Sequence, residues 1–185
     1  RERRQYLEEI KKANETLEQR VQERTQKLSA LREIDLAITS TLDLRIVLDV
    51  LLEKIDRLLP FSACSVELCN AESGTLQPIA TWNINEEEWQ AYRSKGRGLI
   101  DLVFETKRIV TVENLQTDPR VKDPGFFRRH NLVTYVGVPL IAKDEVLGVL
   151  TFFMKEQHQF SNEEVEFLTT LAGQAAIAIH NSQLF

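Results

Sequence analysis

Two cysteines and three histidines are the side chains of this sequence best suited to redox or metal chemistry. Cys64 and Cys69 lie in one predicted strand, an odd number of residues apart, so they face opposite sides and are poorly placed to form a disulfide. His130, His158 and His180 fall in different predicted elements, whereas metal and haem sites need several convergent ligands. No Ser-His-Asp arrangement, carboxylate pair or phosphate-binding glycine loop emerges. The sequence therefore predicts no catalytic residue, no metal site and no haem.

The bulk composition excludes some classes of protein. The chain has 185 residues, 43% of them hydrophobic, and a net charge of -5. It has room for one globular domain plus an extension, with enough apolar side chains for a core. The acidic balance argues against a nucleic-acid partner, since phosphates are bound by an excess of basic residues. No run of about 18 apolar residues and no signal peptide is present, so we expect no membrane contact.

Two further expectations concern the context of the chain. Two cysteines, neither placed to pair with the other, fit a reducing, cytoplasmic location. The chain starts at Arg1 rather than at a methionine, and a helical pattern continues to Phe185. We therefore expect it to be part of a longer protein.

A heptad pattern opens the chain, and the first 59 residues contain neither glycine nor proline. Apolar residues at two positions of every heptad keep one apolar stripe of the helix facing a partner helix. This pattern predicts a parallel coiled-coil homodimer. A buried asparagine at the seam favours an in-register pair, whereas an arginine there fits less well. The alternative is a single long helix packed on its own domain. The predicted interface residues are Leu7, Ile10, Asn14, Leu17, Val21, Leu28 and Leu31, with Arg24 at a further seam position.

The remaining sequence predicts an α+β domain, with the coiled-coil helix at 1–38 and the domain at 39–185. Asp43 is the expected N-cap of a helix that ends at Pro60. Ser161 and Glu164 form an expected capping box at the start of the last helix. Short helices are expected after Asn85, at 99–106 and after Pro124. The predicted strands cover 63–69, 76–82, 109–112, 132–142 and 146–154.

This order of elements, together with several local phrases, resembles a GAF domain over roughly residues 30 to 183. The upstream segment around Leu17 to Thr25 resembles the linker helix of bacterial sensor proteins such as sensor histidine kinases. The phrases within the domain are Thr41-Leu42-Asp43-Leu44, Gly98-Leu99-Ile100, Val138-Pro139-Leu140-Ile141, Val146-Leu147-Gly148-Val149-Leu150, and Phe160-Ser161 followed by Glu164 and Leu168.

The resemblance implies an antiparallel sheet with flanking helices, and a ligand pocket on one face. It also implies a regulatory module of a multidomain signalling protein, with an output domain in the same polypeptide, and we expect that protein to be a sensor histidine kinase. A cyclase, a phosphodiesterase or a transcription activator would fit the same residues. A small molecule or an upstream signal would bias two packings of the helices.

A set of apolar and cationic residues is the candidate pocket of such a domain, since a ligand site needs an apolar wall and a few placed polar groups. The same residues could instead fill the space beneath the irregular segment at 113–131, and they identify no ligand. The candidate wall is Trp82, Phe104, Val112, Phe126, Phe127 and Tyr135, and the candidate mouth is Arg97, Arg120 and Arg128.

Several family functions are not supported by the sequence. Neither cysteine has the adjacent histidine found in bilin-binding GAF domains, so no bilin is expected. The Asn-Lys-Phe-Asp-Glu pattern of cyclic-nucleotide-binding GAF domains is absent, and the cysteine cluster of the free methionine sulfoxide reductases is not reproduced. Two alternatives to a regulatory module stay open. One is a small-molecule redox enzyme with Cys64 or Cys69 as a thiolate, and the other is a dimerisation spacer without a ligand.

Overall fold

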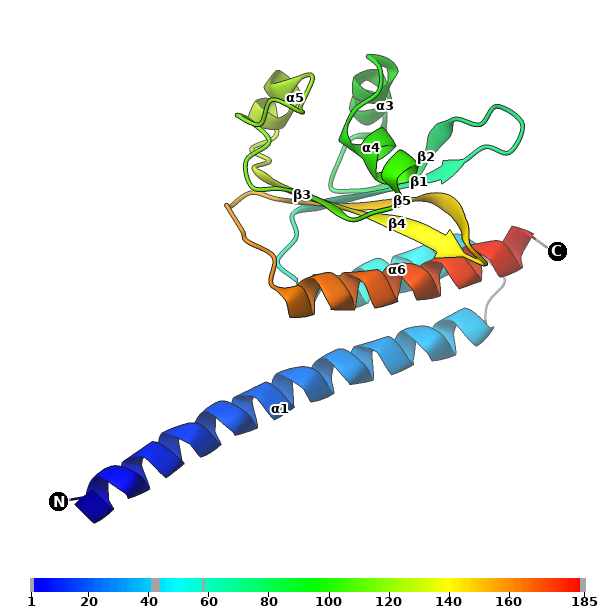
Figure 1. The fold of residues 1–185 in the computed structure, drawn as a ribbon. Coiled ribbons are helices and arrows are strands. Elements are labelled where there is room, and N and C mark those ends of the chain that lie inside the picture. The colour runs from blue at the N-terminus through cyan, green and yellow to red at the C-terminus, as the bar shows by residue number, and fades with distance from the viewer. Residues whose placement is uncertain (1, 41–43, 58, 184–185) are drawn as a thin grey trace.

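A five-stranded antiparallel sheet is the centre of the fold in the computed structural model, which describes residues 2–40, 44–57 and 59–183 (Figure 1). The strand order is β2-β1-β5-β4-β3. The hairpin from β4 to β5 turns at Lys143 and Asp144, whose φ angles of 49° and 63° suit a two-residue turn between twisted strands. The strands are β1 Ala63–Cys69, β2 Leu76–Trp82, β3 Val110–Val112, β4 Thr134–Ala142 and β5 Glu145–Met154.

Helices α2 (Leu44–Asp56) and α6 (Asn162–Gln183) cover one face of the sheet (Figure 1). Cys64, Val66 and Leu68 alternate along β1 onto this face. The predicted capping box of α6 is confirmed: Glu164 accepts from the Ser161 N–H at 3.0 Å, and Ser161 Oγ accepts from the Glu164 N–H at 3.2 Å. The predicted N-cap Asp43 lies outside the described residues.

The opposite face of the sheet is covered by α3 (Glu86–Ser94), α4 (Leu99–Thr106) and α5 (Pro124–Arg129) (Figure 1). Asn85 caps α3 by accepting a hydrogen bond from the Glu88 N–H at 3.1 Å, which confirms the capping pattern expected there. Because both faces are covered, β4 and β5 are buried at nearly every position. The sheet therefore separates two apolar clusters, one toward α2 and α6 and one toward α3, α4 and α5.

Helix α1 (Glu2–Ser40) lies outside α2 and α6, and its N-terminal part extends beyond the domain (Figure 1). Leu31 packs against the apolar cluster of α2 and α6. Toward the N-terminus the seam side chains are exposed, between 56% and 66% for Leu7, Ile10, Leu17, Val21 and Leu28. None of the helices in the described ranges has the length and hydropathy to cross a membrane.

Candidate functional site

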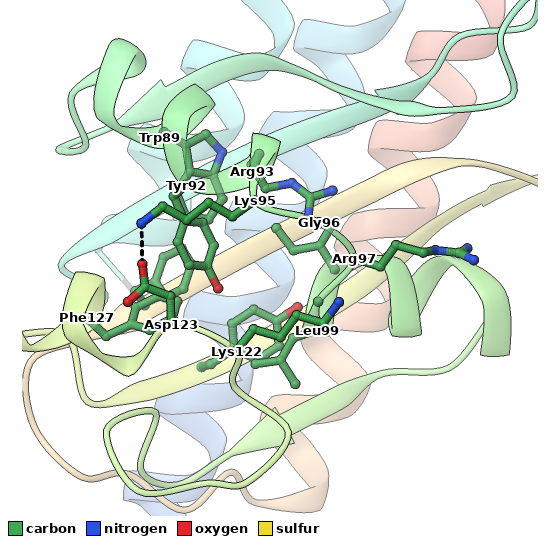
Figure 2. Close-up of a pocket in the computed structure, with 14 residues that line it drawn as sticks. Trp89, Tyr92, Arg93, Lys95, Gly96, Arg97, Leu99, Lys122, Asp123 and Phe127 are labelled. Atoms are coloured by element: carbon green, nitrogen blue, oxygen red, sulfur yellow. Dashed lines mark hydrogen bonds and ion pairs between the residues drawn. The ribbon is translucent and has the colours of Figure 1, made fainter.

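A small cavity lies between the sheet and the segment that joins α3 to α4 (Figure 2). It has a volume of about 20 Å³, roughly the room that one water molecule needs. Its aromatic lining is Trp89, Tyr92, Phe127, Tyr135 and Phe153, and Lys95, Arg97, Lys122 and Asp123 also line it. In this conformation the cavity is too small for a ligand much larger than water, so a larger ligand requires α3 and α4 to move away from the sheet.

The aromatic lining is a packed set of rings supplied by four elements. Trp89 and Tyr92 are three residues apart, so α3 places them on one side. Their ring centroids are 5.3 Å apart, and Tyr92 stacks on Phe126 of α5 at 4.6 Å. Trp89 meets Phe153 of β5 edge-on at 5.6 Å. Such contacts between rings fix the angle at which α3 and α5 lie on the sheet.

A buried ion network ties α3 and α4 to β1. The Glu67 side chain is 0% exposed and that of Arg93 is 11% exposed, and Arg93 Nη2 lies 2.9 Å from Glu67 Oε2. Arg93 Nη1 also lies 3.0 Å from Asp101 Oδ2, and the same oxygen accepts from the Gly98 N–H at 2.8 Å. One guanidinium therefore holds the strand, the end of α3 and the first turn of α4 together.

The two carboxyl groups of this network are shifted in opposite directions. Burial raises the pKa of Glu67, and the charge and hydrogen bonds of Arg93 only partly oppose this effect. For Asp101, burial also opposes ionisation, but hydrogen bonds from Arg93 and the Gly98 N–H outweigh it, so its pKa is lowered. Burial thus favours the neutral form of Glu67, whereas the hydrogen bonds of Asp101 favour its charged form.

Six buried polar side-chain atoms have no hydrogen-bond partner among the described residues, and all but Gln174 Oε1 of α6 gather on this face of the sheet. Ser65 pairs with Thr151, and Thr151 pairs with Gly137, which places these three residues in one row across β1, β5 and β4. The Tyr135 hydroxyl lies over Gly137, in the space that a Cβ would occupy. Native structures satisfy nearly all such groups, so an unsatisfied cluster marks a place for water or a ligand. The atoms on this face are Ser65 Oγ, Glu67 Oε1, Trp89 Nε1, Tyr135 OH and Thr151 Oγ1.

Two of these atoms have close polar neighbours without good hydrogen-bond geometry. The Trp89 N–H lies near enough to Glu67 to lower its pKa, and Thr151 acts in the same way on Tyr135. Burial outweighs both effects, so the pKa values of Glu67 and Tyr135 are raised. Burial also raises the pKa of Tyr92, to about 12. Both tyrosines are therefore neutral hydrogen-bond donors at physiological pH.

The structure brings only part of the predicted pocket set together. Phe127, Tyr135 and Arg97 line the cavity, although Arg97 extends away from it toward Glu105 (Figure 2). Val112 and Phe126 are buried in the same apolar cluster, and Phe104 packs against this cluster half-buried. These residues share one face of the sheet.

Three predicted residues lie elsewhere. Trp82 pairs with Cys64 across β1 and β2, so it faces α2 and α6 on the other side of the sheet. Arg120 pairs with Asp118 at 2.9 Å, and Arg128 donates to the Gln116 carbonyl at 3.0 Å. Neither arginine lines the cavity.

Sequence reasoning missed Glu67, Trp89, Tyr92, Arg93, Lys122 and Phe153 as site residues. The sequence did contain a pattern that could have identified the site residues of α3, because Trp89, Tyr92 and Arg93 recur at helical spacing on one side of a short helix. The charge of Glu67 gave no such signal, since a polar residue alternating along a strand ordinarily faces solvent.

Redox chemistry at Cys64 is disfavoured by its surroundings. Both cysteines are free, Cys64 is buried and Cys69 is partly exposed. Burial raises the pKa of the Cys64 thiol well above its usual range, whereas a reactive cysteine needs a lowered pKa. In the described ranges, no three His, Cys, Asp or Glu side chains converge on a point where they could hold a metal ion.

We predict that alkylation will separate the two thiols. In the folded chain, iodoacetamide at neutral pH should modify Cys69 at an ordinary thiol rate and leave Cys64 unmodified. The reason is that iodoacetamide attacks only those thiolates that it can reach. Intact-mass spectrometry over time measures this, with a urea-unfolded sample as the control in which both thiols react. Rapid modification of Cys64 in the folded chain would contradict the prediction and revive the redox alternative.

Residues 41–180 match the family model described as GAF domain. The chain is 30% identical over 156 residues to the Nif-specific regulatory protein of Herbaspirillum seropedicae, which covers 78% of this chain. The chain spans only 28% of that regulatory protein and 21% of the next curated relative that it matches.

Solved structures share the same fold. The GAF domain of a phosphoenolpyruvate-protein phosphotransferase from Coxiella burnetii is 27% identical, with a TM-score of 0.74, over 86% of this chain and 96% of that one. The GAF domain of a two-component sensor histidine kinase from Bacillus halodurans has a TM-score of 0.62 at 19% identity, over 78% of this chain and 98% of that one. The family match over most of the chain and the shared sheet and helices have one explanation: this chain belongs to the GAF domain family.

Proposed function

We propose that the chain is the regulatory GAF module of a longer bacterial signalling protein, in which α1 forms a parallel coiled-coil dimer. A small molecule in the cavity, or a signal from upstream, biases two packings of the helices. An output domain lies in the same polypeptide, and we favour a sensor histidine kinase. The curated relative that is a regulatory protein supports the regulatory role, and the GAF domain of a sensor histidine kinase with the same fold motivates the choice of output domain.

The observation that carries the proposal is the double role of α1. Five of its seam residues, Leu7, Ile10, Leu17, Val21 and Leu28, are apolar and exposed, which is costly for a lone helix in water. A few residues further on, Leu31 packs into the apolar cluster of the domain. A second copy of α1 would cover the seam, while the end of the same helix stays joined to the sheet.

The sheet supplies a route from the cavity to the helices. Tyr135 of β4 lines the cavity, and its neighbour Val136 points to the opposite face, where it packs in the cluster of α6. Helix α6 packs on β4 and also contacts α1. A ligand that moved β4 would therefore act on α6 and α1 through direct contacts. This route is a physical adjacency, and its coupling energy is for experiment to measure.

Native mass spectrometry of the purified chain tests the proposal as a whole. We expect a dimer, and a dimer with extra mass would identify a bound small molecule. A dimer without extra mass whose cavity binds nothing in a ligand screen would favour the dimerisation spacer. A monomer at micromolar concentration would contradict the coiled coil.

Replacing Asn14 with leucine should tighten the dimer. In a parallel pair the two Asn14 amides are buried at the seam, and removing these buried polar groups stabilises the dimer by about 1–3 kcal/mol, or roughly five- to 150-fold in Kd. Analytical ultracentrifugation over a dilution series measures Kd and oligomeric state. Gln19→Leu is the matched control, because the same heptad count puts Gln19 on the side opposite the seam. Equal dissociation constants for Asn14→Leu and the unmodified chain would show that Asn14 is not a seam residue.

A further inference from the structure

The loop between α3 and α4 and the start of α4 form one wall of the cavity. Helix α4 begins at Leu99, and its N-cap Gly98 has no side chain to accept the first N–H groups of the helix. The Gly98 N–H itself is bound by Asp101 Oδ2. A Cβ on Gly98 would meet nothing within 4 Å, so the space beside the helix start is open. Uncapped N–H groups at such an end attract an anion.

Lys122 brings a positive charge to the same wall. Its Nζ lies 3.6 Å from the position that a Cβ on Gly96 would take, two residues before the N-cap. Figure 2 shows Lys122 directed across the mouth of the cavity, next to Leu99. No ion pair of Lys122 is present among the residues that the structure describes. The other cations at the mouth are engaged: Lys95 binds Asp123 at 2.7 Å, and Arg97 binds Glu105.

Two buried donors whose hydrogen bonds are at best poorly aligned lie deeper in the site, since the Trp89 N–H lies close to Glu67 and the Tyr135 hydroxyl lies close to Thr151. The side chains of Trp89 and Tyr135 both line the cavity and belong to residues that are only 1% exposed. Neither Trp89 Nε1 nor Tyr135 OH has a hydrogen-bond partner among the described residues. An indole N–H can only donate, and a neutral phenol can donate or accept. The cavity therefore offers donors both at its mouth and in its interior.

We propose that the cavity binds a small monocarboxylate, whose carboxylate lies against the start of α4 and Lys122 while its apolar part packs on Phe127 and Phe153. This inference rests on the proposed sensory function and names the class of its ligand. A single negative charge is favoured because Lys122 brings one positive charge that no carboxylate among the described residues balances, whereas Arg93, Lys95 and Arg97 are already paired with carboxylates. Because the cavity holds about 20 Å³, binding moves α3 and α4 away from the sheet.

The test compares acids with their uncharged amides, on the full chain. The probe pairs are acetate with acetamide, isobutyrate with isobutyramide, and benzoate with benzamide, and phenyl phosphate serves as the dianion. Amide proton–nitrogen correlation spectra follow Leu99 and Ile100 directly. We expect at least one acid to shift these two signals saturably, with a Kd about tenfold below that of its amide, as one charge-assisted hydrogen bond provides.

Lys122→Gln separates charge recognition from folding, because Lys122 is exposed. This variant should raise the Kd of the acid to near that of its amide and leave the Kd of the amide unchanged. Lys155→Gln, at an exposed lysine that does not line the cavity, is the matched control and should leave both values unchanged.

The outcomes separate this inference from the proposed function. Acids and amides that bind equally well would overturn the carboxylate class and keep the cavity as a ligand site. Tighter binding of phenyl phosphate than of benzoate would overturn the single charge. If no probe shifts any cavity signal, the inference is overturned, whereas the relay role of the module is still judged by the dimer and the bound mass in native mass spectrometry.

Discussion

Arg93→Met should lower the free energy of unfolding by about 3–5 kcal/mol, the usual effect of removing one partner from a buried ion pair. The variant leaves the Glu67 carboxylate without its cation inside the domain, where its side chain is 0% exposed. It also removes the hydrogen bonds that Asp101 receives from α3. Urea unfolding followed by circular dichroism measures the loss. Helices α3 and α4 should detach from the sheet at lower urea concentrations than those that unfold the rest of the domain.

The loss of unfolding free energy in Arg93→Met should depend on pH, in a direction set by the ionisation of Glu67. Its folded pKa is raised above the ordinary 4.5 by burial, and Arg93 is the main group that opposes the rise. Removing Arg93 raises this pKa further. A group with a raised folded pKa contributes stability below its unfolded pKa, and this contribution disappears as pH rises through the folded value. Asp101 acts in the same sense, because Arg93 lowers its pKa and the resulting stability disappears in acid. The deficit of Arg93→Met should therefore be small in mild acid and largest at neutral pH and above.

Two control variants show whether the destabilisation of Arg93→Met comes from the buried ion network. The double variant Arg93→Met with Glu67→Gln removes both charges, so it should recover a large part of the loss and most of the pH dependence. Arg57→Met breaks the exposed pair with Glu53 on α2, where about 0.5 kcal/mol or less is expected. An Arg93→Met variant as stable as Arg57→Met would show that the network contributes little to stability.

Phe153→Ala should also cost about 3–5 kcal/mol, because a large core side chain is replaced by a cavity. Phe153 is the ring around which the site is packed, with centroids 5.6 Å from Trp89, 5.7 Å from Phe127 and 5.6 Å from Tyr135. Its removal should enlarge the closed cavity and change the environment of Trp89. In a Trp82→Phe background, Trp89 is the one remaining indole of the sequence and reports this change by fluorescence.

Phe152→Ala is the matched control for Phe153→Ala, because the two residues are adjacent in β5 and equally buried. Phe152 faces the other side of the sheet, where it packs on Phe61 at 5.3 Å. Both variants should be destabilised to a similar extent, but only Phe153→Ala should alter Trp89 emission and probe binding. If Phe152→Ala changed Trp89 emission equally, the two faces of the sheet would not be independent.

Local elements followed from the sequence because short-range contacts determine them. The caps at Asn85 and Ser161 join residues three apart in the chain, so their side chains and N–H groups meet whenever the helix forms. The bounds of β1 and β2 followed from alternation and the turn between them, and the structure reproduces both strands. The exposed seam of α1 is equally visible in the heptads.

The candidate site depended on pairings over longer distances. Trp82 and Trp89 are both aromatic residues near the predicted pocket, but only the pairing of Trp82 with Cys64 shows which of them faces the helices α2 and α6. Glu67 lies 26 residues before Arg93 in the chain, and no periodicity links the two. Strand pairing and helix placement bring such groups together, and neither can be read from the local pattern of apolar and polar residues.

The sequence by itself determined the elements, the family resemblance and the apolar stripe of α1, because each depends on the order of neighbouring residues. Only the tertiary structure decided which polar residues are buried. Ser65 and Glu67 alternate with apolar residues like the solvent side of a strand, and they become interior groups because α3 and α4 fold over them. Once water is excluded there, a carboxylate needs a cation and a hydroxyl needs a partner. Arg93 meets the first need, and the hydroxyl groups of Ser65, Tyr135 and Thr151 are left to water or a ligand.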